Sequence, residues 1–185
     1  VCAVTNDDIP PSLTLNKVVV NDNGGAATES QWTMTANGGA AGTLTGPGAA
    51  GSTDVASGNT FQAGTYALAE GSGPAGYSTS GWSCTGVQNT GAAITLAINQ
   101  TAVCTIINDD QPGTLNVIKH VINDNGGAIP AAGFTLTLTA TNVLPSATFP
   151  GAESSGTTLT LNAGTYSVDE AAVVRASTRL DATAR

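Results

Sequence analysis

Short runs of alternating apolar and polar residues, separated by turns rich in Gly and Asn, follow one another along this chain. Residues 12–20 form one such run, because their side chains alternate with the two-residue period of an extended strand. The sequence Asn21-Asp-Asn-Gly-Gly25 comes next and is typical of a turn with positive φ angles. Further short strands are predicted at residues 31–36, 42–44, 65–69, 77–83, 93–98 and 102–108. No run has the periodicity of a helix, so the pattern predicts an all-β sandwich.

The pattern occurs twice, with matching residues 102 positions apart (104 − 2 and 123 − 21, for example). The segment Val1-Cys-Ala-Val-Thr-Asn-Asp-Asp8 returns as Val103-Cys-Thr-Ile-Ile-Asn-Asp-Asp110. The turn at Asn21 returns at Asn123. A spacing of this length indicates tandem copies of a whole domain. We therefore predict tandem immunoglobulin-like or prealbumin-like β-sandwich domains.

The copies divide the chain into four segments. Residues 12–110 form a complete repeat, and residues 114–170 form a second repeat that lacks its last two or three strands. Residues 1–9 match the last strand of a preceding repeat, or a donor strand. Residues 171–185 are a divergent tail, which contains all three arginines. The segments Pro10-Pro11 and Pro112-Gly113 are predicted to be short, stiff linkers.

Composition limits the function classes. Only 10% of the residues are charged, against roughly 25% in typical globular chains. The net charge of −8 argues against nucleic acid or anionic membranes as partners. The sequence has no apolar run long enough to span a bilayer. It also contains no catalytic triad, zinc ligand set or phosphate loop, so we expect no enzyme beyond amide chemistry on the protein itself.

The cysteines indicate an oxidising compartment. Cys84 and Cys104 lie on late strands of one unit, so a disulfide within that unit is the natural pairing, worth about 3 kcal/mol. Cys2 is the copy of Cys104, and its partner would precede Val1. The alternative is a reduced cytosolic protein with three buried thiols. Because the composition and the repeats favour an oxidising compartment, we expect an extracellular or cell-surface location.

Lys17 lies on the apolar face of its strand, where an unpaired ammonium group is costly to bury. Other notable positions follow in order: Gly64-Thr-Tyr66 through Glu70, then Pro74, Gly76 and Tyr77, and a final strand ending at Asn108. This ordered set resembles the collagen-adhesin B-type, or SpaA-like prealbumin-fold, repeat domain of bacterial surface proteins. The resemblance covers the first unit and the second as far as Glu170. It implies a structural module of a stalk or pilin shaft.

The resemblance also implies an isopeptide bond between Lys17 and Asn108, promoted by Glu70. Burial disfavours charge, so it favours a neutral amine beside a neutral acid, which can attack and polarise a carboxamide. The alternative is a plain buried ion pair between Lys17 and Glu70. The second unit keeps Lys119 and Glu170 but has no acceptor Asn.

Asn6 is the copy of Asn108 and would serve an upstream unit. Residues 1–8 of one molecule could instead fill the gap in the second unit of a neighbour, where Asn6 would approach Lys119 and Glu170. Head-to-tail repetition of that contact would give an open filament. A fragment of a longer natural array is the simpler explanation, with neighbouring repeats as the partners.

Oxygen-bearing side chains gather at the turns. If the first and last strands run parallel, Asp22 and Asn23 lie near Asp109 and Asp110, at the end of the first unit. Oxygen ligands of this kind suit Ca²⁺. An ordinary turn followed by an ordinary strand exit explains the same residues.

The sequence therefore favours a structural repeat module. The second hypothesis is an adhesive domain that binds through loops such as residues 38–60. That function would need exposed aromatic side chains, and this loop contains almost none.

Overall fold

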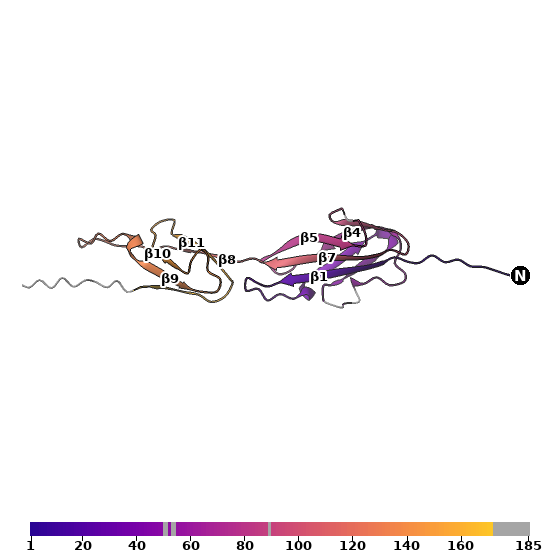
Figure 1. The fold of residues 1–185 in the computed structure, drawn as a ribbon, viewed down its shortest axis with the longest axis horizontal. Coiled ribbons are helices and arrows are strands. Elements are labelled where there is room, and N and C mark those ends of the chain that lie inside the picture. The colour runs from indigo at the N-terminus through magenta and orange to yellow at the C-terminus, as the bar shows by residue number, and fades with distance from the viewer. Residues whose placement is uncertain (50–51, 53–54, 89, 172–185) are drawn as a thin grey trace, which may run out of the picture. The chain divides into compact units, whose positions relative to one another are not determined.

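The computed structural model describes residues 1–49, 52, 55–88 and 90–171 (Figure 1). The regular elements of these residues are β-strands and three-residue 3₁₀ turns, without an α-helix. The predicted all-β fold is therefore confirmed. None of the described segments forms a helix of the length and hydrophobicity needed to cross a membrane. The chain divides into two compact units, Val1–Gln111 and Pro112–Arg185, which are described separately.

The first unit is a sandwich of two sheets. A three-stranded sheet has the order β1-β7-β5, and a four-stranded sheet has the order β3-β2-β4-β6. Its elements are β1 (Ser12–Val20), η1 (Glu29–Gln31), β2 (Thr33–Asn37), η2 (Gly39–Ala41), β3 (Thr43–Pro47), β4 (Gly64–Glu70), β5 (Tyr77–Thr85), β6 (Ala93–Leu96) and β7 (Thr101–Asp110). The first strand β1 runs parallel to the last strand β7, in register from Ser12 beside Thr101 to Val20 beside Asp109 (Figure 1).

Alternation along the strands builds one core between the two sheets. Leu13 and Leu15 of β1 are buried, while Thr14 between them is half-buried and the next residue, Asn16, is exposed. Tyr66 of β4 is fully buried and stacks on Phe61 with ring centroids 4.5 Å apart. Its hydroxyl donates to the carbonyl of Gln62, so the polar end of this aromatic core residue is satisfied.

The predicted disulfide is confirmed. Cys84 of β5 and Cys104 of β7 are directly opposite each other in an antiparallel pair, and their sulfur atoms are bonded. Cys104 is fully buried against the core. Cys2 is an exposed free cysteine.

The second unit repeats part of this arrangement. Its two sheets have the orders β10-β9-β12 and β11-β8. Its elements are β8 (Gly113–Val117), η4 (Ala131–Gly133), β9 (Thr135–Thr139), β10 (Thr148–Pro150), β11 (Thr157–Leu161) and β12 (Ser167–Glu170). Leu136, Leu138 and Leu159 form its buried core together with neighbouring apolar residues.

The structure departs from the predicted strands in two places. Residues 1–9 form no strand, because no strand lies beside them among the described residues. Gly164-Thr-Tyr166 repeats Gly64-Thr-Tyr66 at the start of β4, which predicts a strand from Gly164, but β12 begins only at Ser167, and Tyr166 is exposed although its counterpart Tyr66 is buried. In the first unit β6 pairs with β4 at Tyr66, and the described part of the second unit offers no such neighbour. Of the predicted tail, residues 172–185 lie outside the described residues.

Replacing both Cys84 and Cys104 by Ala should lower the free energy of unfolding of the first unit by about 3 kcal/mol, because the unfolded chain loses its cross-link. Denaturant unfolding followed by tryptophan fluorescence measures this, since both tryptophans, Trp32 and Trp82, belong to the first unit. The variant Cys2→Ser is the control and should unfold like the parent protein. An unchanged midpoint in the double variant would contradict a stabilising disulfide.

Candidate functional site

The centre of the candidate site is the Lys17 side chain, which β1 directs into the sandwich. None of the side-chain surface of Lys17 is exposed. Its ammonium nitrogen lies 4.8 Å from the centre of the Trp32 ring, which is a cation–π distance. Gly48 leaves room for the lysine stem, because a Cβ at Gly48 would lie only 2.7 Å from Lys17 Cβ. The lysine therefore occupies a slot between an aromatic ring and bare backbone.

Glu70 joins Lys17 to Asn108. The Lys17 Nζ atom is 3.1 Å from Glu70 Oε1, and Asn108 Nδ2 donates a hydrogen bond of 3.2 Å to Glu70 Oε2. Asn108 is 4% exposed and the Glu70 side chain is 12% exposed. The structure thus brings together the three residues that the sequence singled out, one each from β1, β4 and β7.

Burial sets the electrostatics of this cluster. Desolvation lowers the pKa of Lys17, and the hydrogen bond and negative charge of Glu70, with the charge of Glu29, oppose that shift only in part. A lowered pKa increases the fraction of neutral, nucleophilic amine. The Asn108 Oδ1 atom is buried and has no hydrogen-bond partner among the described residues. The cluster therefore contains a nucleophile, an acid and an uncompensated amide carbonyl.

The second unit contains the same cluster without an acceptor amide. Lys119 Nζ is 2.9 Å from Glu170 Oε2 and 4.5 Å from the centre of the Phe134 ring. Gly151 leaves room for the stem of Lys119, as Gly48 does for Lys17. The side chains of Lys119 and Glu170 are 21% and 37% exposed, so this copy is more open. No hydrogen bond joins this pair to an Asn among the described residues.

Asp110, at the end of β7, holds the turn after β1. Its carboxylate accepts hydrogen bonds from the backbone N–H groups of Asp22, Asn23 and Gly25. Burial raises the pKa of Asp110, but the hydrogen bonds from Asn23, Gly25 and Asp22 outweigh burial, and the net pKa is lowered. Tyr77 also holds this turn, because its hydroxyl donates a hydrogen bond to Asn21 Oδ1. We call these contacts of Asp110 and Tyr77 the turn anchor.

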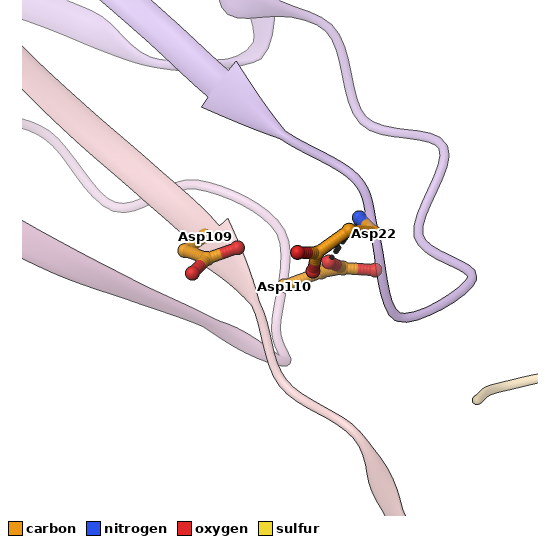
Figure 2. Close-up of side chains that lie close together, drawn as sticks. All are labelled: Asp22, Asp109 and Asp110. Carbon is orange, nitrogen blue, oxygen red and sulfur yellow. Dashed lines mark hydrogen bonds between the residues drawn. The ribbon is translucent and has the colours of Figure 1, made fainter. Parts of the chain in front are cut away.

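The predicted carboxylate cluster also forms in the structure. Asp22, Asp109 and Asp110 each offer one oxygen within 4.8 Å of the others (Figure 2). Asn23 lies beside them but uses its side-chain N–H₂ group to donate to Asp22 Oδ1 and to the Asp110 carbonyl. The Asp109 Oδ1 atom is buried and makes no hydrogen bond within the described residues. The oxygen set suits Ca²⁺, and calcium binding stays a prediction.

Sequence reasoning did not identify three residues that shape the site. The match of Trp32 with Phe134 predicts a core residue in each repeat, and it was also the available signal for a ring beside each lysine. Gly48 and Gly151 are 103 positions apart, whereas the other matching residues are 102 positions apart. This difference of one residue hid their correspondence. Tyr77 was seen only as part of a family pattern, because its hydrogen bond to the turn joins residues far apart in sequence.

Together these features define a β-sandwich repeat module with a buried Lys–Glu–Asn cluster between its first and last strands. Residues 8–106 and 110–179 match the family model of a prealbumin-like fold domain, so this chain belongs to that family. The match confirms the resemblance found in the sequence, and SpaA-like domains of this kind are typical of cell-surface pilin modules. No curated protein and no solved structure matches the chain.

The lowered pKa of Asp110 predicts a pH dependence of stability. Its carboxylate stabilises the folded state above the unfolded pKa of about 3.9, and this contribution is lost as the pH falls through the lower folded pKa. Asp110→Asn should therefore be less stable than the parent at neutral pH, with a smaller loss below about pH 4. Chemical unfolding from pH 7 to pH 2 in chelator tests this. Asp109→Asn is the matched control; an equal effect of both changes would contradict the anchor.

Calcium should raise the melting temperature of the first unit if the carboxylate cluster binds it, because a ligand that binds only the folded state stabilises that state. Thermal unfolding with and without millimolar-range Ca²⁺ measures the shift, with Mg²⁺ as a comparison. Asp109→Asn should abolish the calcium response. A melting temperature that ignores both calcium and chelator would refute the site.

Proposed function

We propose that this protein is a load-bearing repeat module in the stalk or shaft of a secreted or cell-surface bacterial protein. The observation that carries the proposal is the buried Lys17–Glu70–Asn108 cluster, which lies between the first and last strands of a prealbumin-like sandwich. The disulfide between Cys84 and Cys104 supports an extracellular location, since such bonds persist in oxidising compartments.

The strand order explains why a cross-link at this place would matter mechanically. The chain enters the first unit at the start of β1 and leaves it at the end of β7, and these two strands are parallel neighbours. Force on the two ends therefore shears one strand along the other. A covalent bond from Lys17 to Asn108 would carry this load directly. Roughly 90 residues between them, about 300 Å of extended chain, would then be shielded from stretching.

The proposed reaction forms an amide between Lys17 and Asn108. The neutral Lys17 Nζ attacks Asn108 Cγ, a C–N bond forms, and the amide nitrogen leaves as ammonia after it receives the proton from the amine. Protonated Glu70 can donate to the uncompensated Asn108 Oδ1 once the amide group turns over, and it then carries the proton to the leaving group. Trp32 and Gly48 hold the lysine stem in place for the attack.

Intact mass spectrometry should show the protein lighter by one ammonia, and tandem spectra of a digest should contain the joined Lys17 and Asn108 peptides. Glu70→Gln should greatly slow or abolish the bond because the carrier of the proton is lost. The same change in the second unit, Glu170→Gln, is the matched control and should leave the Lys17–Asn108 peptide intact. Locating the bond is necessary, since an Asn-Gly step can also lose ammonia. If the joined peptide is absent, Lys17 and Glu70 form an ion pair only.

A further inference from the structure

The first unit contains two Asn-Gly steps whose surroundings differ. Asn23-Gly24 lies in the turn after β1, and Asn37-Gly38 lies at the end of β2. Asn is a chemically labile residue. When Gly follows it, the backbone nitrogen of the Gly can attack the Asn side chain, because a residue without a Cβ permits that close approach. The structure around each step therefore decides whether the attack can take place.

The backbone nitrogen of Gly24 is available for this reaction. Asp110 accepts hydrogen bonds from the N–H groups on either side of it, those of Asn23 and Gly25. No hydrogen bond joins the Gly24 N–H group to another of the described residues. Gly24 is exposed to water, and its φ of 92° favours a glycine at this position. The anchor thus holds the neighbours of the reactive nitrogen and leaves that nitrogen open.

The backbone nitrogen of Gly38 is engaged instead. Its N–H group donates a hydrogen bond of 2.9 Å to the carbonyl of Gly42. The other side of Gly38 is covered by the Tyr66 ring, because a Cβ at Gly38 would lie only 2.5 Å from a ring carbon. The Asn37 Oδ1 atom accepts a hydrogen bond of 2.9 Å from the N–H group of Gly39. Both halves of this step must therefore give up a contact before they can react.

The two Asn side chains also have opposite hydrogen-bonding roles. The Asn23 amide group donates to Asp22 Oδ1 at 2.6 Å and to the carbonyl of Asp110 at 3.0 Å. The Asn37 side chain accepts, through its Oδ1 atom. An ionised carboxylate accepts hydrogen bonds and donates none. The same conversion of Asn to Asp would therefore break the contacts of Asn23 and keep those of Asn37.

We propose that Asn23 is a site of spontaneous deamidation in the folded protein, and that its conversion to a carboxylate loosens the turn anchor. Water is the only co-reactant that the reaction requires. The proposal depends on the contacts of the turn after β1 and is independent of the bond proposed between Lys17 and Asn108.

The reaction has two steps. The Gly24 nitrogen releases its proton to water and attacks Asn23 Cγ, a C–N bond forms, and the side-chain nitrogen takes a proton from water and leaves as ammonia. The product of this step is a five-membered succinimide ring. Water then adds to one of the two ring carbonyls and opens the ring, which gives either Asp or isoaspartate at position 23. One water molecule is consumed and one ammonia is released, without oxidation or reduction.

Either product opposes the contacts that hold the turn. A carboxylate at position 23 would face the Asp110 carbonyl and the carboxylates of Asp22, Asp109 and Asp110, which already lie within 4.8 Å of one another (Figure 2). Repulsion then replaces two donated hydrogen bonds. Isoaspartate adds a carbon to the main chain between the N–H groups of Asn23 and Gly25, so the two groups fit the Asp110 carboxylate less well.

Incubation of the 185-residue protein in weakly alkaline buffer made with heavy-oxygen water tests the modification. Peptide maps taken over time should show heavy oxygen entering the Asn23 peptide about tenfold faster than the Asn37 peptide, because Gly38 must first break a hydrogen bond. The Asn37 peptide is the internal control. In guanidinium chloride the two peptides should react at similar rates. Equal rates in the folded protein would overturn the proposal, as would the same tenfold difference in denaturant.

The variant Asn23→Asp, which encodes one product, tests the effect on the turn anchor. Chemical unfolding at neutral pH in chelator should show its folding equilibrium constant reduced on the order of tenfold, because two hydrogen bonds are replaced by repulsion. Asn37→Asp is the matched control: it makes the same chemical change at a side chain that accepts, and should unfold like the parent. Equal effects of the two changes would overturn the loosening of the anchor. The labelling rates are measured on the parent protein and do not depend on how either variant folds.

Discussion

The parallel pairing of β1 with β7 is the contact on which the first unit depends. It closes the sandwich with the two strands that are farthest apart in sequence, in register from Ser12 to Val20. Because side chains alternate along both strands, the same register directs Lys17 and Asn108 into the core. It also brings Asp110 to the turn that follows β1. Core closure, the polar cluster and the turn anchor are thus consequences of one strand pair.

The first unit contains β7, whereas the described part of the second unit contains no counterpart of this strand. A comparison of the two units therefore shows what β7 contributes. The lysine, its acidic partner, its aromatic neighbour and the glycine beside its stem occur in both units. The lysine–glutamate pair therefore does not require β7, which supplies Asn108 to the cluster of the first unit. Full burial of the lysine is found only where β7 is present: the lysine side chain is fully covered in the first unit and 21% exposed in the described second unit. Since desolvation is what lowers the pKa of Lys17, the cover that β7 provides favours the neutral amine that the proposed cross-link requires.

Burying a polar side chain costs free energy unless its polar atoms are hydrogen-bonded. Lys17, Asn108 and Asp110 are the charged or polar residues buried in the described structure. Asp110 is well satisfied by backbone donors, whereas Asn108 leaves an amide oxygen without a partner. An unsatisfied buried carbonyl is destabilising in an ordinary core. In this cluster it marks the atom that a neighbouring acid would have to polarise.

The sequence alone determined the all-β class, the repeat spacing and the approximate places of the strands in the first unit, because alternation and turn residues are local signals. It also identified Lys17, since a lysine on an apolar strand face is conspicuous, and the family resemblance added Glu70 and Asn108. Only the tertiary structure decided that Glu70 lies between Lys17 and Asn108, that Trp32 and Gly48 form the slot, and that Asp110 engages the turn. These contacts join positions far apart in the chain, and their geometry depends on how the two sheets pack.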